Sequence, residues 1–264
     1  MAIKYTLQGL LVYLALAFHL LAFLGRLMRF NRLSRRLYLG GFVTVVLAFV
    51  YRWLDVGHVP LQSLFEVFLC LGMVYPLSLF CRRFLGAGGE TADMLLGFVV
   101  LFPAGFVFDA RPLHLPPALQ SPLFVPHVAA YMAAYIILTK AAVQAAARLL
   151  IGPAPAEFRL ATYETAAYRL VCLGFPLLTL GLILGSIWGK LAWGDYWHWD
   201  PKELWSLVSW LIYLIYLHVR RLYGPRYPRL NSVLVLLGLV AIVITLLWVN
   251  LSRLFPGLHS YAGA

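Results

Sequence analysis

Hydrophobic residues occur along the chain in eight long runs, separated by short segments that hold most of the charged residues, glycines and prolines. A helix needs about 20 apolar residues to cross the hydrocarbon core of a bilayer. Runs of this order lie at roughly 7–25, 38–54, 63–81, 93–109, 123–147, 168–188, 202–219 and 232–251. The pattern predicts an all-α polytopic integral membrane protein with about eight transmembrane helices. No loop is long enough for a separate soluble domain, so residues 1–264 are expected to form a single membrane domain.

One stretch interrupts this pattern with polar residues and large aromatic rings. Residues 188–205, here called the tryptophan segment, read WGKLAWGDYWHWDPKELW and contain five of the eight tryptophans. Near its end, Asp200, Pro201 and Glu203 stand where an N-cap, an N1 proline and an N3 capping-box glutamate belong at a helix start. We therefore expect a loop or short surface element that leads directly into the next helix. A second capping box is predicted at Ser63 and Glu66.

Composition supports the membrane interpretation. The chain is 62% hydrophobic and 12% charged, and its mean hydropathy is +0.84, far from the averages of soluble domains. The net charge of +11 fits an excess of basic residues on the cytoplasmic side and attraction to anionic lipid. We therefore expect the positive charge to interact with the lipid bilayer and not with nucleic acid.

The distribution of basic residues predicts the orientation. The loops after the first, third, fifth and seventh runs and their flanks hold 15 lysines and arginines, whereas the opposite side holds six. Because basic residues accumulate in cytoplasmic loops, both termini are expected to be extracytoplasmic. The tryptophan segment then lies at the outer face, together with five of the seven histidines: His58, His114, His127, His198 and His259.

The tryptophan segment has two interpretations. Aromatic residues commonly form a belt at the membrane interface. However, the density of tryptophans favours an apolar platform for a large planar ligand, built from Trp193, Trp197 and Trp199, with indole N–H groups and charges at its rim. In this interpretation, Asp200 is either a helix cap or a partner of the ligand-binding groups.

The outer histidines are candidate ligands for such a molecule. His127 begins the fifth run, and His259 lies just beyond the eighth. Imidazole is a usual axial ligand of haem iron, and a porphyrin requires apolar surfaces around it. His127 and His259 are therefore a candidate pair, while His114 and His198 are competing candidates on the same side.

A second candidate site lies deeper in the membrane. His218 follows Glu203 by fifteen residues, which corresponds to about 22 Å along a helix. It is either an interfacial residue or a haem ligand in the cytoplasmic half, because ionisable groups within membranes are often functional. His19 is expected at the same depth, so a His19–His218 pair is also conceivable.

Two motifs are absent from the sequence. There is no CxxCH, so no covalent c-type haem of the chain's own is expected. There is also no GxxxxGK[ST], which argues against ATP-driven pumping by this chain.

Several segments together carry a family resemblance. WGDYWHWDPKELW at 193–205 resembles the WWD signature of haem-handling proteins in cytochrome c maturation. Other segments resemble the CcsA (ResC) branch in the same order: GHVPLQSLFEVFLCLG at 57–72, PLFVPHVAAYMAAY at 122–135, SWLIYLIYLHVR at 209–220 and FPGLHSYAG at 255–263. The resemblance extends from the second run to the C-terminal end.

This resemblance implies a haem-binding membrane subunit of a System II cytochrome c synthase (a holocytochrome c synthase, or cytochrome c haem-lyase). Such a subunit acts with a CcsB (ResB) membrane partner on the CxxCH of apocytochrome c, and a thioredoxin-like thiol reductant acts indirectly. Haem b would be bound non-covalently, as both ligand and substrate. The expected location is a bacterial cytoplasmic membrane, favoured over a plastid thylakoid membrane, with the active face outside.

The resemblance also implies roles for individual residues. His127 and His259 match the family's two external haem ligands, and His218 matches its membrane histidine, whose second ligand would come from the CcsB component. That assignment weakens the His19–His218 pairing. His198 stands at a variable position of the motif and is left out of the ligand set. No catalytic acid or base is assigned.

Three alternatives remain open at this point. A CcmC-like protein would deliver haem to a chaperone, but such proteins usually have about six spans, and FPGLHSY fits CcsA better. A haem exporter would leave attachment to another protein. A b-type electron-transfer subunit would need paired histidines at matched depth, which only His19 and His218 offer.

Overall fold

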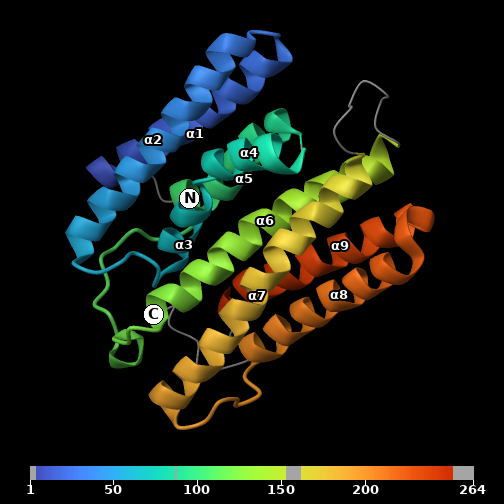
Figure 1. Ribbon diagram of the computed structural model, residues 1–264. Helices are drawn as coiled ribbons and strands as arrows, with labels where there is room; N and C mark the ends of the chain where they lie inside the picture. Colours follow the sequence, from blue (N-terminus) through green and yellow to red (C-terminus); the bar gives the residue numbers. More distant parts are fainter. Residues whose placement is uncertain (1–3, 87, 153–161, 252–264) are drawn as a thin grey trace. The chain divides into compact units, whose positions relative to one another are not determined.

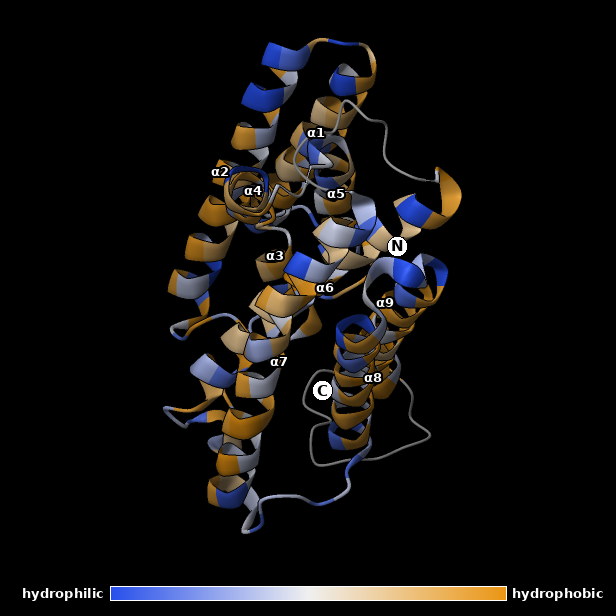
Figure 2. Cartoon of the chain, turned by 45° about the vertical axis from the view of Figure 1, so that its right-hand side comes forward, coloured by the Kyte–Doolittle hydropathy of each residue, from blue (hydrophilic) through white to orange (hydrophobic). Residues whose placement is uncertain are grey.

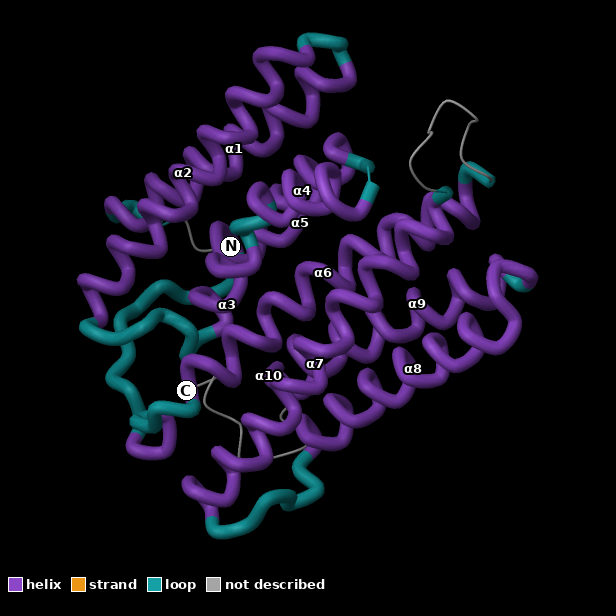
Figure 3. The backbone as a smooth tube through the Cα atoms, in the orientation of Figure 1, coloured by secondary structure: helices purple, strands orange, loops and turns teal. Residues whose placement is uncertain are grey.

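A computed structural model describes residues 4–86, 88–152 and 162–251, and all regular structure in these ranges is helical (Figures 1 and 3). The chain divides into two compact units. Unit 1 comprises residues 1–80 and 89–117, and unit 2 comprises residues 81–88 and 118–264.

Unit 1 is built on a long helical hairpin. Helix α1 (Leu7–Leu27) packs against α2 (Asn31–Val56) and α5 (Glu90–Phe106). Two short helices, α3 (Leu64–Leu71) and α4 (Tyr75–Phe80), complete it, and α3 packs mainly on α5. The run expected as one helix over 63–81 is therefore interrupted, because α3 ends at Gly72 and the helix resumes at Tyr75.

Unit 2 contains four long helical segments. These are α6 (Phe124–Leu150), α7 (Tyr163–Trp193), α8 (Pro201–Tyr223) and α9 (Pro228–Val243), and α9 continues through the π-helical η4 (Ile244–Trp248) into α10 (Val249–Leu251). Short elements accompany them: η1 (Cys81–Leu85), η2 (Pro117–Leu119) and η3 (Gly224–Arg226). Neighbouring helices are antiparallel. For example, the start of α6 lies beside the C-terminal half of α7, where His127 Nδ1 is 2.9 Å from Gly181 O.

The prediction of a multi-pass membrane protein is confirmed. Six helical segments in the described residues are long and apolar enough to cross a membrane: 7–27, 31–56, 64–85, 124–150, 163–193 and 228–251. Figure 2 shows hydrophobic residues along the lengths of these helices and hydrophilic residues at the turn that joins α1 to α2. Two of the eight predicted spans, α5 and α8, are helical but are not among the six, since α5 has only 17 residues and α8 carries charge at both ends. The count of eight and the orientation of the termini stay predictions.

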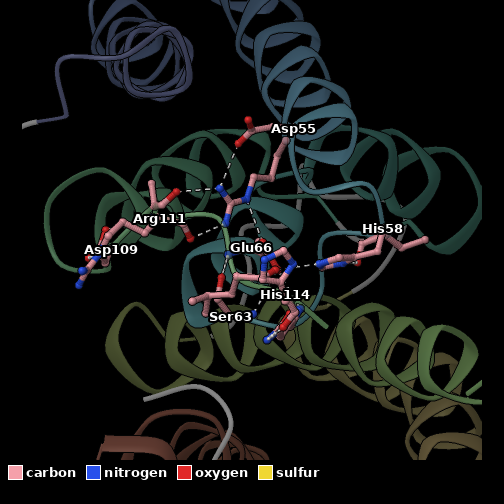
Figure 4. A network of polar contacts seen from close by, with 12 residues as sticks. Asp55, His58, Ser63, Glu66, Asp109, Arg111 and His114 are labelled. Atoms are coloured by element: carbon pink, nitrogen blue, oxygen red, sulfur yellow. Dashed lines mark hydrogen bonds and ion pairs between the residues drawn. The ribbon is translucent and has the colours of Figure 1, made fainter. Parts of the chain in front are cut away.

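A buried ion pair organises one end of unit 1 (Figure 4). The Arg52 side chain is 1% exposed, and its Nε donates to Glu66 Oε1 at 2.9 Å. Its two terminal nitrogens donate to backbone carbonyls, Nη1 to Ala110 O at 2.7 Å and Nη2 to Arg111 O at 3.0 Å. The guanidinium of α2 thereby fixes the loop that follows α5.

The same carboxylate starts α3. Glu66 Oε2 accepts from the backbone N–H of Gln62 at 2.9 Å and of Ser63 at 3.2 Å. Ser63 Oγ in turn accepts from Glu66 N at 3.3 Å, so the predicted capping box is confirmed. Two further contacts join these loops, from His58 Nε2 to Leu113 O and from Gln62 Nε2 to the backbone oxygen of His114.

This arrangement predicts a large difference between two carboxylate substitutions. Glu66→Gln removes the nearer and more deeply buried of the two carboxylates that pair with the Arg52 guanidinium, the other being Asp55 at 3.5 Å. Breaking a buried pair costs roughly 3–5 kcal/mol. Asp109→Asn removes the partner of Arg111 in an exposed pair, whose side chains are 59% and 84% exposed, and such pairs contribute about 0–1 kcal/mol. Thermal unfolding of the protein in detergent micelles should therefore show a much lower midpoint for Glu66→Gln than for Asp109→Asn. Equal midpoints would show that the Arg52–Glu66 pair does not organise unit 1.

Candidate functional site

Helix α7 extends further into the tryptophan segment than the sequence predicts. The expected run stops at residue 188, but the helix continues to Trp193 and ends at Gly194. Gly194 has φ +95°, a left-handed conformation that glycine adopts readily at a helix end, and its N–H donates to Lys190 O at 3.2 Å. Trp188 and Trp193 therefore lie on helix turns, and only residues 194–200 are non-helical.

The start of α8 matches the prediction. Asp200 is the N-cap, its Oδ1 accepts from Lys202 N at 2.9 Å, and Pro201 occupies the first helical position. Glu203 Oε2 reaches back to accept from Asp200 N at 3.2 Å and also from His198 N at 2.8 Å. Glu203 therefore fixes the backbone of the two residues that flank Trp199. The cap role of Asp200 is confirmed, and its role beside a ligand stays a prediction.

The tryptophan rings pack edge to face. Trp188 and Trp193 have centroids 4.8 Å apart at 60°, and Trp193 meets His198 at 6.2 Å and 88°. Trp197 and Trp199 meet each other at 6.1 Å and 83°, so they share a side of the segment as their i, i+2 spacing suggests. Because the rings are inclined to one another, the segment is a faceted aromatic wall and not one flat surface. Trp199 is 66% exposed.

His127 lies beside this wall, in the first turn of α6. Its ring is 5.8 Å from that of Trp188 and 5.1 Å from that of Tyr131. Its Nδ1 is 2.9 Å from Gly181 O of α7. A carbonyl oxygen only accepts, so Nδ1 carries the proton and the neutral ring has its lone pair on Nε2. This is the state of a metal-binding imidazole whose other nitrogen is held by a backbone carbonyl.

Glycines of α7 make this approach possible. A Cβ at Gly185 would lie 2.5 Å from His127 Cε1 and 2.9 Å from its Nδ1, and a Cβ at Gly181 would lie 2.9 Å from the Tyr131 ring. Sequence reasoning missed these positions. The signal was present in the spacing of Gly181, Gly185 and Gly189, a small-residue repeat that lets membrane helices pack closely.

Two ring nitrogens of the tryptophan segment lack partners within the described residues. Trp197 Nε1 and His198 Nδ1 are both buried without a hydrogen bond there. The other nitrogen of His198 is 3.9 Å from Asp195 Oδ2. Buried polar atoms without partners are uncommon in proteins. Together with apolar aromatic faces, they fit a bound molecule that is mostly apolar and has polar groups at its edge.

His218 makes no ring contact with this cluster among the described residues. His218 is exposed on α8, and its Nδ1 is 2.8 Å from Leu214 O, one turn earlier in the helix. His259 lies outside the described residues. The structure thus brings together His127, Trp188, Trp193 and His198 through ring contacts, and Trp197 with Trp199.

Comparison with known proteins identifies relatives. The cytochrome c assembly protein family matches residues 6–256. The cytochrome c biogenesis protein CcsA of Synechococcus sp. (strain JA-3-3Ab) is 31% identical over 289 residues, which cover 84% of this chain and 83% of that protein. CcsA of Chlamydomonas reinhardtii is 31% identical over 231 residues, which cover 82% of this chain but only 65% of that protein.

A solved structure shares the fold. The cytochrome c heme lyase CcmF superposes with a TM-score of 0.67 at 23% identity. The match covers 93% of this chain and 48% of that one, so the chain spans about half the length of CcmF.

The glycine contacts predict opposite outcomes for two neighbouring alanine substitutions. Alanine favours a helix over glycine by about 1 kcal/mol, and a Cβ at Gly189 would meet only ordinary contacts of 3.4 Å and beyond. Gly189→Ala should therefore leave stability unchanged or raise it. Gly185→Ala should displace His127, lower the unfolding midpoint, and alter the near-ultraviolet circular dichroism of the tryptophans. If both variants behave alike, the close approach of His127 to α7 is wrong.

Proposed function

The chain belongs to the cytochrome c assembly protein family, and from this premise we propose that it is the haem-binding membrane subunit of a System II cytochrome c synthase. It is a multi-pass membrane protein with a role in cytochrome c maturation. The proposal is carried by one observation in unit 2: His127 is held by Gly181 O with its lone pair on Nε2, against the tryptophan segment.

His127 is one axial ligand of haem b in this proposal. The aromatic wall of Trp193, Trp197 and Trp199 covers the porphyrin, whose apolar faces favour such a surface. The ring nitrogens of Trp197 and His198, unpartnered within the described residues, suit the polar edge of the molecule. Asp200 positions the tryptophan segment indirectly in this proposal. It caps α8, the helix that follows Trp199, and forms a capping box with Glu203.

His259 is the second external ligand in this proposal. The described chain ends at Leu251, and the side chain of the preceding Asn250 accepts from Lys202 Nζ at 2.9 Å. The end of α10 is thus joined to the beginning of α8. Leu251, the last described residue before His259 in the sequence, therefore lies at the end of unit 2 where α8 begins.

In this proposal the protein contributes to the reaction mainly by positioning the haem and the peptide. In thioether formation, each cysteine S–H of the CxxCH adds across one vinyl C=C of haem, so no electrons are exchanged with an outside reagent. Two neutral imidazoles hold the substrate at the iron until the histidine of apocytochrome c replaces one of them. The tryptophan segment orients the vinyl-bearing edge toward the incoming peptide, which is catalysis by proximity and orientation.

His218 is the intramembrane ligand in this proposal, and a CcsB-type partner supplies the other. Its imidazole is exposed on unit 2, within a stripe of exposed apolar residues on α8: Leu204, Val208, Leu211, Ile215 and Leu222. An ionisable side chain in such a stripe favours contact with another protein over contact with lipid. The active face is extracytoplasmic, in a bacterial cytoplasmic membrane.

The external ligands can be tested by spectroscopy. The chain would be purified with its CcsB-type partner, and the reduced absorption spectrum recorded. His127→Ala and His259→Ala should each diminish the low-spin bis-imidazole signal, because each removes one axial ligand. His114→Ala, which removes an exposed imidazole of unit 1, is the matched control and should keep the signal. A signal unchanged in both His127→Ala and His259→Ala would contradict the assignment.

The deep ligand has its own test. His218→Ala should lower the haem content of the purified complex while the variant still folds, since the side chain is exposed and its one hydrogen bond among the described residues is to Leu214 O in the same helix. The neighbouring exposed position offers a control, Ile215→Ala, which should retain haem. Undiminished haem in His218→Ala would rule out a deep site at this residue.

A further inference from the structure

His19 is a buried histidine that the proposed function does not use. It lies on α1 in unit 1 and is fully buried. Its Nδ1 is 2.8 Å from Ala15 O, so Nδ1 donates and the neutral ring keeps its lone pair on Nε2. This Nε2 is buried and has no hydrogen-bond partner in the part of the chain that the structure describes.

Two glycines hold the His19 ring between α2 and α5. A Cβ at Gly41 would lie 2.7 Å from both Cε1 and Nδ1, and a Cβ at Gly97 would lie 2.7 Å from Nε2. The backbones of both helices therefore cover the ring. A porphyrin does not fit at this nitrogen, which argues against the His19–His218 haem pairing that depth alone suggests.

Tyr38 supplies the complementary group. It is fully buried, and its ring meets that of His19 edge-on, with centroids 5.6 Å apart at 82°. Its hydroxyl lies near the Ser78 hydroxyl but makes no hydrogen bond of ordinary length among the described residues. One buried acceptor, His19 Nε2, and one buried hydroxyl, that of Tyr38, thus occur in the same cluster, each without an ordinary hydrogen bond in the described part of the chain.

A carboxyl group lies next to this pair. Tyr38 precedes Gly41 by three residues on α2, and Asp93 precedes Gly97 by four on α5, so both are about one helical turn from the glycines that enclose His19. Asp93 is 1% exposed, and its Oδ2 accepts from Ser78 Oγ at 2.5 Å. Toward the end of the helices, Glu90 pairs with Arg26 and Arg35 at the surface. The cluster is therefore a polar region within an apolar bundle.

Buried polar atoms without protein partners usually bind ordered water, which needs two to four polar partners. We propose that unit 1 binds a water molecule that accepts from the Tyr38 hydroxyl and donates to His19 Nε2. With this water, the cluster is a hydrated proton-accepting site inside a membrane-spanning bundle. The water joins His19 Nε2 and the Tyr38 hydroxyl in one hydrogen-bonded chain, near the Asp93 carboxyl group. Chains of histidine and carboxylate residues in membranes often serve proton transfer.

Removal of the Tyr38 hydroxyl distinguishes a hydrated site from a dry one. If the hydroxyl has no partner, Tyr38→Phe removes an unsatisfied group and raises the unfolding midpoint. If water bridges it to His19, Tyr38→Phe lowers the midpoint. The effect should then be largely lost in a His19→Leu background, because the two groups share one water. Tyr75→Phe is the matched control, since its ring also packs on Tyr38, at 4.9 Å, and it should show no dependence on His19.

A second measurement does not depend on the stability of variants. In protein carrying 15N-histidine, a bridged His19 should show the Nε2 resonance of a hydrogen-bonded imidazole, and Tyr38→Phe should move it toward the position of a free nitrogen. A free-nitrogen resonance in the unmodified protein, or an increase in midpoint for Tyr38→Phe, would overturn the proposal. Neither result depends on haem binding at His127. The proposed water site and the proposed haem-binding function are therefore tested independently.

Discussion

The way α7 ends and α8 begins determines the candidate site. The last carbonyls of one helix and the first N–H groups of the next have no partners in their own helices, and they must be satisfied at the connection. Gly194 ends α7 in a left-handed conformation. Asp200 accepts from the N–H of Lys202 in the first turn of α8, and Glu203 accepts from the N–H groups of His198 and Asp200 in the connection. Only residues 194–200 remain to join the helices. The wall of tryptophans beside His127 is a consequence of this short connection, fixed at both ends by backbone hydrogen bonds.

A second common feature is the state of the histidines. The Nδ1 atoms of His19, His127 and His218 are each 2.8–2.9 Å from a backbone carbonyl oxygen, and each therefore presents a lone pair at Nε2. The three histidines share this tautomer, but they lie in different surroundings. His127 meets tryptophan rings, His218 is exposed on α8, and His19 is enclosed by glycines beside Tyr38. The same imidazole chemistry thus suits an outer ligand, a ligand shared with a partner, and a proton acceptor.

Local sequence signals predicted much of this structure. The helices follow from apolar runs, and both capping boxes, at Ser63–Glu66 and at Asp200–Glu203, follow from residue types at fixed spacing. Contacts between helices were not predictable in the same way. The pairing of Arg52 with Glu66, the carbonyl partner of His127 and the inclination of the tryptophan rings depend on tertiary packing. The predicted run ended at residue 188, whereas Gly189 is accommodated inside α7 and Gly194 ends the helix.

The central claim is that this chain presents haem for attachment to a cytochrome. The most direct measurement is its co-expression with a CcsB-type partner and a CxxCH apocytochrome in a host without its own maturation system. Haem that stays on the cytochrome after denaturing electrophoresis would then be quantified. We expect covalently bound haem with the unmodified chain and its loss with His127→Ala. A complex that binds haem with two imidazole ligands but yields no linked cytochrome would rule out a role in attachment and favour haem delivery or export.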